Sequence, residues 1–294
     1  MLARPEWLRV KIPSGENFVN LRNTLRDQNL KTVCEEASCP NKAECWSSGN
    51  ATIMLMGEVC TRGCKFCDVT TGRPSTLDRF EPLRVAQTLK KWNLKYVVIT
   101  SVCRDDLEDG GAQHFAETIG LVKLYCPKTM VETLIPDFDG KKESIGKIVK
   151  EKPLVISHNI ETVKRLTSEV RDFRANYHKS ISVLKTIKEQ NPCIFTKSSL
   201  MLGLGETEDE VIEAAKDLIK NNVDIITLGQ YLQPSRKHLP VKEFISPEKF
   251  EFYKKMFQKM GFLYVVAGPL VRSSYKALDF VNTLQKIKFN YSGV

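Results

Sequence analysis

The sequence predicts an α/β fold in which six parallel strand–helix units form a partial, open barrel. Six short and nearly continuous apolar runs recur between residues 52 and 229, and segments with helical spacing lie between them. Runs of this kind are typical of parallel strands that are buried on both faces. Eight such units would close a full (β/α)8 barrel, so six are expected to leave it open.

Each unit can be located in order along the chain. The expected strands are Thr52–Met56, Tyr96–Ser101, Met130–Ile135, Leu154–Ser157, Ser199–Leu204 and Ile225–Gly229. The helical stripes, which indicate core packing against the sheet, are Val85/Leu89/Trp92, Phe115/Ile119/Val122, Val211/Ala215/Leu218 and Phe250/Tyr253/Phe257/Met260. Thr207 is expected to cap the third of these helices.

Two extensions flank the expected barrel and divide the chain into three parts. Residues 1–45 form an N-terminal arm in which Ser14 could cap a helix over about residues 15–29. The barrel is expected over residues 46–263, and residues 264–294 form a C-terminal extension outside the repeat. This extension follows a strand-like run, Leu263–Val266, which turns at Gly268–Pro269.

Composition indicates a globular protein of a reducing compartment. Hydrophobic residues make up 42% and charged residues 27% of the 294 residues. We expect no transmembrane helix and no secretory signal, and therefore a cytoplasmic protein whose nine cysteines serve metal ligation rather than disulfides. The net charge of +9 fits either a lysine-rich solvated surface or a surface that binds an acidic partner. The positive residues are spread along the chain, so the charge alone does not indicate that the partner is a nucleic acid.

Six of the nine cysteines fall into two triplets within residues 34–67. The first triplet is Cys34-x4-Cys39-x5-Cys45, and the second is Cys60-x3-Cys64-x2-Cys67. Three thiolates can hold three corners of a tetrahedral metal site or of a cubane cluster. A structural zinc site requires four closed ligands, and neither triplet has an obvious fourth partner nearby. Three thiolates on a [4Fe–4S] cubane would instead leave one iron open.

The second triplet resembles the CxxxCxΦC signature of the radical S-adenosylmethionine (SAM) superfamily, with Phe66 as the aromatic residue. The resemblance implies a partial (β/α)6 TIM-type barrel and a [4Fe–4S] cluster on Cys60, Cys64 and Cys67. It also implies that the open iron chelates SAM through its amino and carboxylate groups.

SAM contacts are expected at the carboxyl ends of the strands, where sites form in such folds. Asn159 and Glu161 are candidates for the ribose hydroxyls, and Lys197 or Ser199 for the carboxylate. The adenine is expected near Phe66 and near Gly203, Gly205 and Glu206. The four histidines are expected to be structural.

The first triplet, together with further motifs, resembles the lipoyl synthase family. These motifs are Val69–Pro74, Arg104–Asp106 with Asp109–Gly111, Gly203–Thr207, Gly229–Pro234 and Arg272-Ser273-Ser274-Tyr275. The resemblance covers about residues 15–280 and implies a second, auxiliary [4Fe–4S] cluster on Cys34, Cys39 and Cys45. By its place in the Arg272 motif, Ser274 rather than Ser273 is the implied fourth ligand. The two extensions are therefore expected to meet over the barrel mouth.

The same resemblance implies the reaction and its partners. Reductive cleavage of SAM yields a 5′-deoxyadenosyl radical, which takes hydrogen atoms from an octanoyl chain amide-linked to a lysine of a lipoyl carrier domain. Two sulfur atoms from the auxiliary cluster are then inserted at C6 and C8. The implied partners are 2-oxoacid dehydrogenase E2 subunits, the glycine cleavage H protein, flavodoxin or ferredoxin as electron donor, and cluster-repair proteins, without nucleic acid or membrane.

Two other readings of the sequence stay open. One is another radical SAM sulfur-inserting enzyme, either biotin synthase-like or an RNA methylthiotransferase, although 294 residues leave no room for the extra domains of the latter. The other is a non-enzymatic zinc or nucleic-acid-binding protein. Cys103, Cys126 and Cys193 lie outside both triplets and are expected to behave as small buried hydrophobes.

Overall fold

The computed structural model describes residues 4–9, 16–47, 52–275, 279–280 and 283. Its centre is one curved sheet in the order β1-β2-β5-β6-β7-β8-β9-β10. The strands are β1 Lys31–Thr32, β2 Thr52–Leu55, β5 Tyr96–Ser101, β6 Met130–Leu134, β7 Val155–Ser157, β8 Phe195–Leu202, β9 Ile225–Gln230 and β10 Tyr264–Gly268. All neighbours are parallel except β1 and β2, which are antiparallel.

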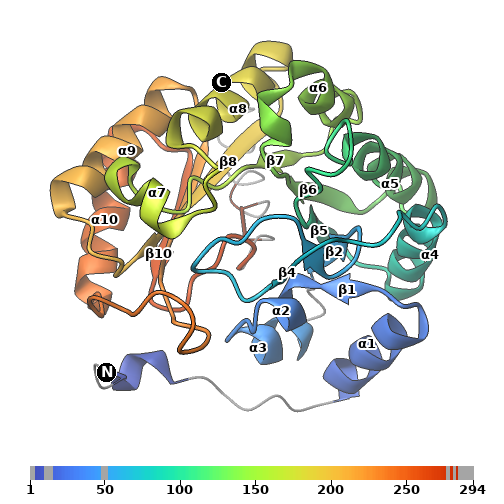
Figure 1. Ribbon diagram of the computed structural model, residues 1–294, viewed down its shortest axis with the longest axis horizontal. Helices are drawn as coiled ribbons and strands as arrows, with labels where there is room; N and C mark the ends of the chain where they lie inside the picture. Colours follow the sequence, from blue (N-terminus) through green and yellow to red (C-terminus); the bar gives the residue numbers. More distant parts are fainter. Residues whose placement is uncertain (1–3, 10–15, 48–51, 276–278, 281–282, 284–294) are drawn as a thin grey trace, which may run out of the picture.

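Helices cover the outer face of the sheet and leave one side of the ring open (Figure 1). The covering helices are α4 Glu81–Trp92, α5 Ala112–Tyr125, α6 Lys142–Lys150, α8 Tyr177–Gln190, α9 Glu208–Lys220 and α10 Pro247–Met260. Thr207 caps α9 as expected, since its hydroxyl accepts from Glu210 N at 3.3 Å while the Glu210 carboxylate accepts from Thr207 N at 2.8 Å. The expected partial barrel is therefore confirmed.

Shorter elements belong to the extensions and to the loops at the strand ends. They are η1 Glu6–Leu8, α1 Glu16–Asp27, α2 Val33–Glu36, α3 Lys42–Ser47, β3 Val59–Cys60, β4 Thr70–Thr71, η2 Phe138–Gly140, η3 Lys164–Leu166 and α7 Thr167–Val170. The helix expected in the N-terminal arm is confirmed as α1, while Ser14 lies outside the described residues. None of the described helices is long and apolar enough to cross a membrane.

The sheet departs from the expected strands at three places. The short strand β1 adds an antiparallel edge that was not expected. The run after Leu263 joins the sheet as β10, a seventh parallel strand, which pairs with β9 from Tyr264 opposite Ile225 to Gly268 opposite Gly229. Strand β8 begins at Phe195, four residues before its expected start. Its first half contains Lys197 and Ser198, whose polarity hid the strand although both side chains are buried. The division into three parts stays a prediction.

The two extensions meet in the gap between the edge strands β1 and β10. Segments α2 and α3 follow β1, and the C-terminal motif follows β10, so each extension continues from one edge of the sheet (Figure 1). Asn41 Nδ2 donates to Leu270 O at 2.5 Å, and the Tyr275 hydroxyl donates to Glu44 Oε1 at 3.1 Å. The extensions were expected to meet over the barrel mouth. They do contact each other, but the contact lies in the gap between the two edge strands of the sheet.

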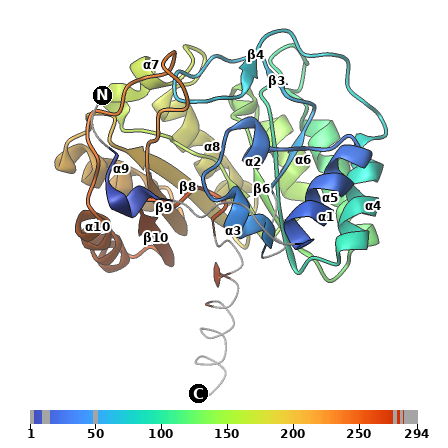
Figure 2. The same cartoon turned by 90° about the horizontal axis from the view of Figure 1, so that it is seen from below.

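Figure 2 shows the loops with β3 and β4 at one end of the barrel, together with α7. This is the end at which the parallel strands finish, because β3 and β4 follow β2, and α7 follows β7. The second cysteine triplet lies in this region, as expected for a site at the carboxyl ends of parallel strands.

Candidate functional site

A cavity of about 890 Å³ occupies the interior of the barrel, and both cysteine triplets line it. The C-terminal motif lines it too, through Arg272, Ser273, Ser274 and Tyr275. Residues 34 and 274, which are far apart in the sequence, therefore line the same cavity. The apolar part of the cavity wall includes Met54, Val98, Val102, Leu134 and Ile135.

Backbone N–H groups point at the sulfur atoms of the second triplet. Cys60 Sγ accepts from Arg62 N at 3.4 Å and from Cys103 N at 3.3 Å, and Cys64 Sγ accepts from Asp172 N at 3.3 Å. A hydrogen bond from the Cys103 thiol, together with these N–H groups, lowers the pKa of Cys60. Burial raises the pKa of Cys67 to about 12, so this sulfur needs a bound cation to become a thiolate.

A buried arginine fixes the first half of the loop that carries the second triplet. Arg62 donates through Nη1 to Asp137 Oδ2 at 2.7 Å and through Nη2 to Asp105 Oδ1 at 2.6 Å. Its side chain is 5% exposed, so the two carboxylates neutralise a charge that could not otherwise be buried. Pairing with Arg62 outweighs burial and lowers the pKa of Asp137 to about 2.

The rest of this loop is held by segments that follow β7 and β9. Gly63 N donates to Asp172 Oδ2 at 2.9 Å, and Arg174 Nη2 donates to Thr61 O at 2.6 Å. His238 Nε2 donates to Cys67 O at 3.0 Å, which agrees with the structural role expected for histidines. The triplet is thus positioned by contacts that do not depend on a bound cluster.

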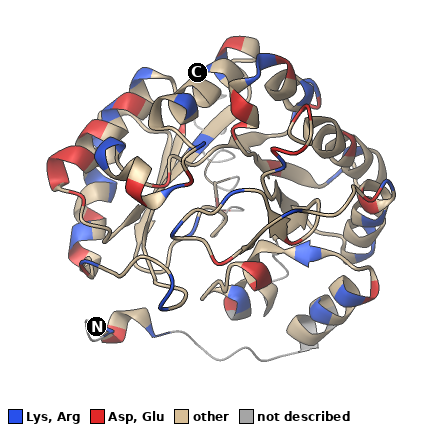
Figure 3. Cartoon of the chain, viewed as in Figure 1, with Lys and Arg blue, Asp and Glu red and all other residues tan. Residues whose placement is uncertain are grey.

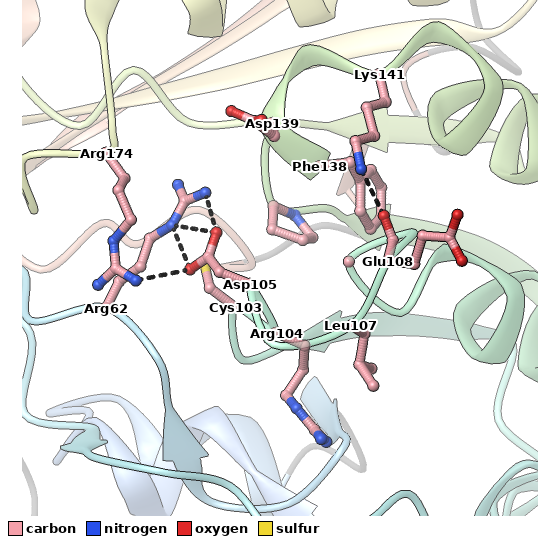
Figure 4. A pocket seen from close by; sticks show the side chains of 12 residues that line it. Arg62, Cys103, Arg104, Asp105, Leu107, Glu108, Phe138, Asp139, Lys141 and Arg174 are labelled. Atoms are coloured by element: carbon pink, nitrogen blue, oxygen red, sulfur yellow. Dashed lines mark hydrogen bonds and ion pairs between the residues drawn. The ribbon is translucent and has the colours of Figure 1, made fainter.

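A smaller pocket of about 250 Å³ lies beside this loop, and Figure 4 shows it. Arg62, Cys103 and Pro136 line both this pocket and the main cavity. Its cationic groups have protein partners: Arg174 and Arg62 contact Asp105, Arg104 contacts Asp106, and Lys141 Nζ donates to Glu108 O at 2.6 Å. The pocket therefore offers a polar wall to the loop rather than a free positive charge.

The first triplet lies on α2, on α3 and on the turn between them. Cys39 N donates to Cys34 O at 3.1 Å, and Cys45 N donates to Asn41 O at 2.9 Å. Burial raises the pKa of the Cys34 thiol to about 11. Burial also lowers the pKa of Arg272, and the charge of nearby Cys39 opposes that shift. The C-terminal motif is therefore held against this triplet.

No three His, Cys, Asp or Glu side chains converge on a single-metal site within the described part of the chain. A [4Fe–4S] cubane bonds each cysteine to a different iron, so its thiolates need not converge on one point. Sulfur ligands spread along a cavity wall suit that geometry.

Four of the expected SAM contacts line the cavity, namely Phe66, Asn159, Glu161 and Ser199. Asn159 Nδ2 donates to Glu161 Oε1 at 3.2 Å, while Asn159 Oδ1 is buried without a protein partner. Ser101 Oγ and Arg171 Nε also lack partners, and both residues line the same cavity. Buried polar atoms are normally paired, so these three orphaned atoms fit a polar ligand such as SAM.

The other expected SAM contacts are not among the residues that line the cavity. Lys197 Nζ donates to Glu132 Oε1 at 2.8 Å in a buried ion pair inside the sheet. The Glu206 carboxylate accepts hydrogen bonds from Gly203 N and from Leu204 N, the second at 2.9 Å. These bonds hold the loop that contains Gly203, Gly205 and Glu206. Ser101 and Arg171 were not predicted as SAM contacts. The only signal in the sequence was their position, because Ser101 ends a strand and Arg171 lies in a loop at the carboxyl end of the sheet.

His158 is buried beside the cavity and is held as the neutral tautomer. Its Nδ1–H donates to Ile135 O at 2.9 Å, so Nε2 accepts from the Ser180 hydroxyl at 2.9 Å. Burial, and then the charge of Arg171, lowers the pKa of His158 to about 4. Both ring nitrogens thus have protein partners, which agrees with the structural role expected for the histidines.

This histidine is expected to make stability depend on pH. Between pH 6.5 and 4 the unfolded chain binds a proton at His158 that the folded chain excludes, so stability falls as pH falls through this window. The expected loss between pH 7 and 5 is about 2 kcal/mol. Urea unfolding of the cluster-free protein and of His158→Gln at both pH values measures it. An equal pH dependence in the two proteins would contradict the assignment.

Gly229 allows the C-terminal segment to approach β9. A β-carbon at this position would lie 2.0 Å from Val271 O and 3.3 Å from Arg272 Nη1. Gly229→Ala is therefore expected to displace the Arg272 motif, to cost about 1–3 kcal/mol of stability and to lower the iron bound at the first triplet. Iron analysis and urea unfolding measure both effects.

A matched control is Gly120→Ala in α5, where an added β-carbon meets only the flexible Glu151 side chain, at 3.1 Å. Alanine there is expected to retain all iron and to gain up to about 1 kcal/mol from helix propensity. If both variants bound iron as the unchanged protein does, Gly229 would have no role in placing the motif.

The fold and the site together define a radical SAM enzyme, which uses SAM and an iron–sulfur cluster. Residues 54–218 match the radical SAM superfamily. SuiB of Streptococcus suis bound to S-adenosylmethionine superposes with a TM-score of 0.57 at 12% identity, covering 77% of this chain and 54% of that chain. Methylornithine synthase superposes with a TM-score of 0.53 at 15% identity, covering 82% of this chain and 73% of that chain. These likenesses show the fold.

The chain belongs to the lipoyl synthase family of sulfur-inserting enzymes. Residues 1–39 match the N-terminal domain of lipoyl synthase. Lipoyl synthase of Myxococcus xanthus is 52% identical over 94% of this chain and 93% of its own length. The mitochondrial lipoyl synthase of Schizosaccharomyces pombe is 51% identical over 94% of this chain and 76% of its own length. The apicoplast lipoyl synthase of Plasmodium knowlesi is 52% identical over 94% of this chain and 63% of its own length. The chain thus spans less than two thirds of the Plasmodium protein.

Proposed function

We propose that this enzyme inserts two sulfur atoms, at C6 and C8, into an octanoyl chain that is amide-linked to a lysine of a lipoyl carrier protein. The single observation that carries the proposal is the cavity lined at once by both cysteine triplets and by the Arg272 motif. A substrate chain in this space lies between a radical source and a sulfur source. The apolar wall around Val98, Leu134 and Ile135 suits a hydrocarbon chain.

Cys60, Cys64 and Cys67 are proposed to hold the cluster that binds SAM. When bound, the cluster and SAM supply reductive cleavage to methionine and a 5′-deoxyadenosyl radical. Asn159 and Glu161 orient the ribose, and Phe66 packs against the adenine. The orphaned Asn159 Oδ1 supports this placement. Lys197, Gly203, Gly205 and Glu206 are not retained as SAM contacts, because they do not line the cavity.

Cys34, Cys39 and Cys45, with Ser274 as the fourth ligand, are proposed to hold the auxiliary [4Fe–4S] cluster, whose sulfide is the sulfur substrate. A serine oxygen is a harder ligand than a thiolate and is more easily displaced from iron. Arg272, which is partly buried near Cys39, offsets the negative charge of this ligand set. The contacts between Asn41 and Leu270 and between Tyr275 and Glu44 support the placement.

The proposed partners follow from this reaction. The enzyme acts on lipoyl carrier proteins, and we propose E2 subunits of 2-oxoacid dehydrogenases and the glycine cleavage H protein as the particular carriers. Flavodoxin or ferredoxin supplies electrons, and cluster-repair proteins restore the auxiliary cluster. The net charge of +9 would favour acidic carriers, so activity should fall as salt rises. A cytoplasmic location stays a prediction.

The test is an anaerobic assay of the reconstituted enzyme with SAM, dithionite and an octanoyl-lysine peptide. Mass spectrometry should detect 5′-deoxyadenosine and a peptide that has gained two sulfur atoms. The protein should be brown and should lose its colour in air, whereas a zinc protein would be colourless. The absence of both 5′-deoxyadenosine and sulfur-containing peptide would contradict the proposed function.

A further inference from the structure

Phe173 is the most exposed large hydrophobic side chain among the described residues, with 86% of its surface accessible. It lies on the loop after α7, directly beside Asp172, whose backbone N–H donates to Cys64 Sγ at 3.3 Å. The Arg174 guanidinium lies over its ring, 5.0 Å from the centroid. An aromatic ring thus stands in solvent one residue away from a hydrogen bond to a proposed cluster ligand.

Basic side chains lie on two segments that are hydrogen-bonded, directly or in turn, to the segment that carries this ring. Lys65 N donates to Val170 O at 2.9 Å, and Leu239 N donates to Lys65 O at 3.2 Å, so three segments are bonded side by side. Lys65, Arg236 and Lys237 are exposed on them, and Figure 3 shows basic positions along these loops. Glu169 is the exposed acid of the α7 segment, so the surface remains strongly positive.

We propose that Lys65, Phe173, Arg174, Arg236 and Lys237 form the docking surface of an acidic protein that delivers single electrons to the SAM-side cluster. This inference rests on the proposed function, because each cleavage of SAM consumes one electron. The donor loses that electron, the bond between C5′ and sulfur breaks, methionine leaves, and the C5′ radical takes a hydrogen atom from the substrate carbon.

Two observations favour an electron donor over a lipoyl carrier as the occupant. Lys65, Phe173, Arg236 and Lys237 are not among the residues that line the cavity, so this surface is not part of the wall that an octanoyl chain must contact. Asp172, by contrast, links this surface directly to Cys64 Sγ. Transient electron-transfer contacts are small and rely on opposite charge for fast encounter.

The experiment compares two reductants at low salt, with reconstituted enzyme and an octanoyl-lysine peptide that needs no carrier docking. One reductant is flavodoxin hydroquinone, an acidic protein, and the other is dithionite, which needs no docking surface. In the Arg236→Glu/Lys237→Glu variant and in Phe173→Ser, 5′-deoxyadenosine formation with flavodoxin should fall about tenfold. With dithionite the rate should stay within about twofold of that of the unchanged enzyme.

The control variant is Lys91→Glu/Lys95→Glu, which changes the net charge equally. Both lysines are exposed next to the start of β5, at the opposite end of the barrel from the cluster loop. Its flavodoxin-supported rate should match that of the unchanged enzyme.

Equal losses with both reductants, no loss with flavodoxin, or an unchanged enzyme that flavodoxin cannot reduce would each overturn the proposal. A loss seen only with an octanoylated carrier domain would assign the surface to the carrier instead. If the unchanged enzyme made no 5′-deoxyadenosine even with dithionite, the proposed function itself would fail.

Discussion

Alanine at Cys60, Cys64 and Cys67 together is expected to abolish the cleavage of SAM. Without these thiolates no open iron remains to chelate SAM, and the rate of 5′-deoxyadenosine formation should fall by at least about a thousandfold. The barrel should stay folded, because Arg62, Asp105 and Asp137 position this loop through contacts that the variant keeps.

Iron analysis and the anaerobic assay measure this effect together. Bound iron should fall from about eight to about four atoms per chain, since the first triplet keeps its own cluster. Circular dichroism should show an unchanged fold. A variant that still produced 5′-deoxyadenosine at an ordinary rate would show that the second triplet is not the radical source.

Alanine at Cys34, Cys39 and Cys45 is expected to give the complementary result. SAM cleavage should continue within about twofold, because the second triplet is untouched, whereas the sulfur-containing peptide should fall by at least about a thousandfold. Bound iron should again be halved. Mass spectrometry of the peptide and quantification of 5′-deoxyadenosine in one sample separate the two activities.

A pair of neighbouring serines provides the matched comparison for this second prediction. Ser274→Ala should lower product formation and make the auxiliary cluster easier to lose, while Ser273→Ala should change neither. Both side chains line the cavity, so the pair tests ligation rather than simple proximity. The reverse order of effects would move the fourth ligand to Ser273. Product formation that survived loss of the whole first triplet would contradict its role as sulfur source.

The sequence predicted the elements whose signals are local. Strand β5 was predicted with its observed bounds, because Tyr96–Ser101 is a β-branched apolar run buried on both faces. The cap on α9 was predicted from Thr207, whose bond partner lies three residues away. The spacing within each cysteine triplet likewise needed no knowledge of the fold.

Long-range pairing was the part that the sequence could not supply. Lys197 resembled a carboxylate ligand until the structure placed it beside Glu132, two strands away in the sheet. Arg171 carries no local motif that marks it as a site residue, yet it is buried and lines the cavity. The contact between the two extensions was predicted only because a family resemblance joined Cys34 to Ser274.

The bond between Asn41 and Leu270 joins residues separated by 229 positions. At ribosomal rates of 5–20 residues per second, roughly 10 to 50 s pass between the synthesis of these two residues. During that interval a nascent chain carries Cys34, Cys39 and Cys45 without the segment that completes their site. The loop of Cys60 is completed earlier, once His238 has emerged, 171 residues after Cys67. Synthesis therefore makes the partners of the two triplets available in a fixed order: the contact that holds the loop of Cys67 can form once residue 238 has emerged, whereas the contact beside the first triplet must wait for residue 270.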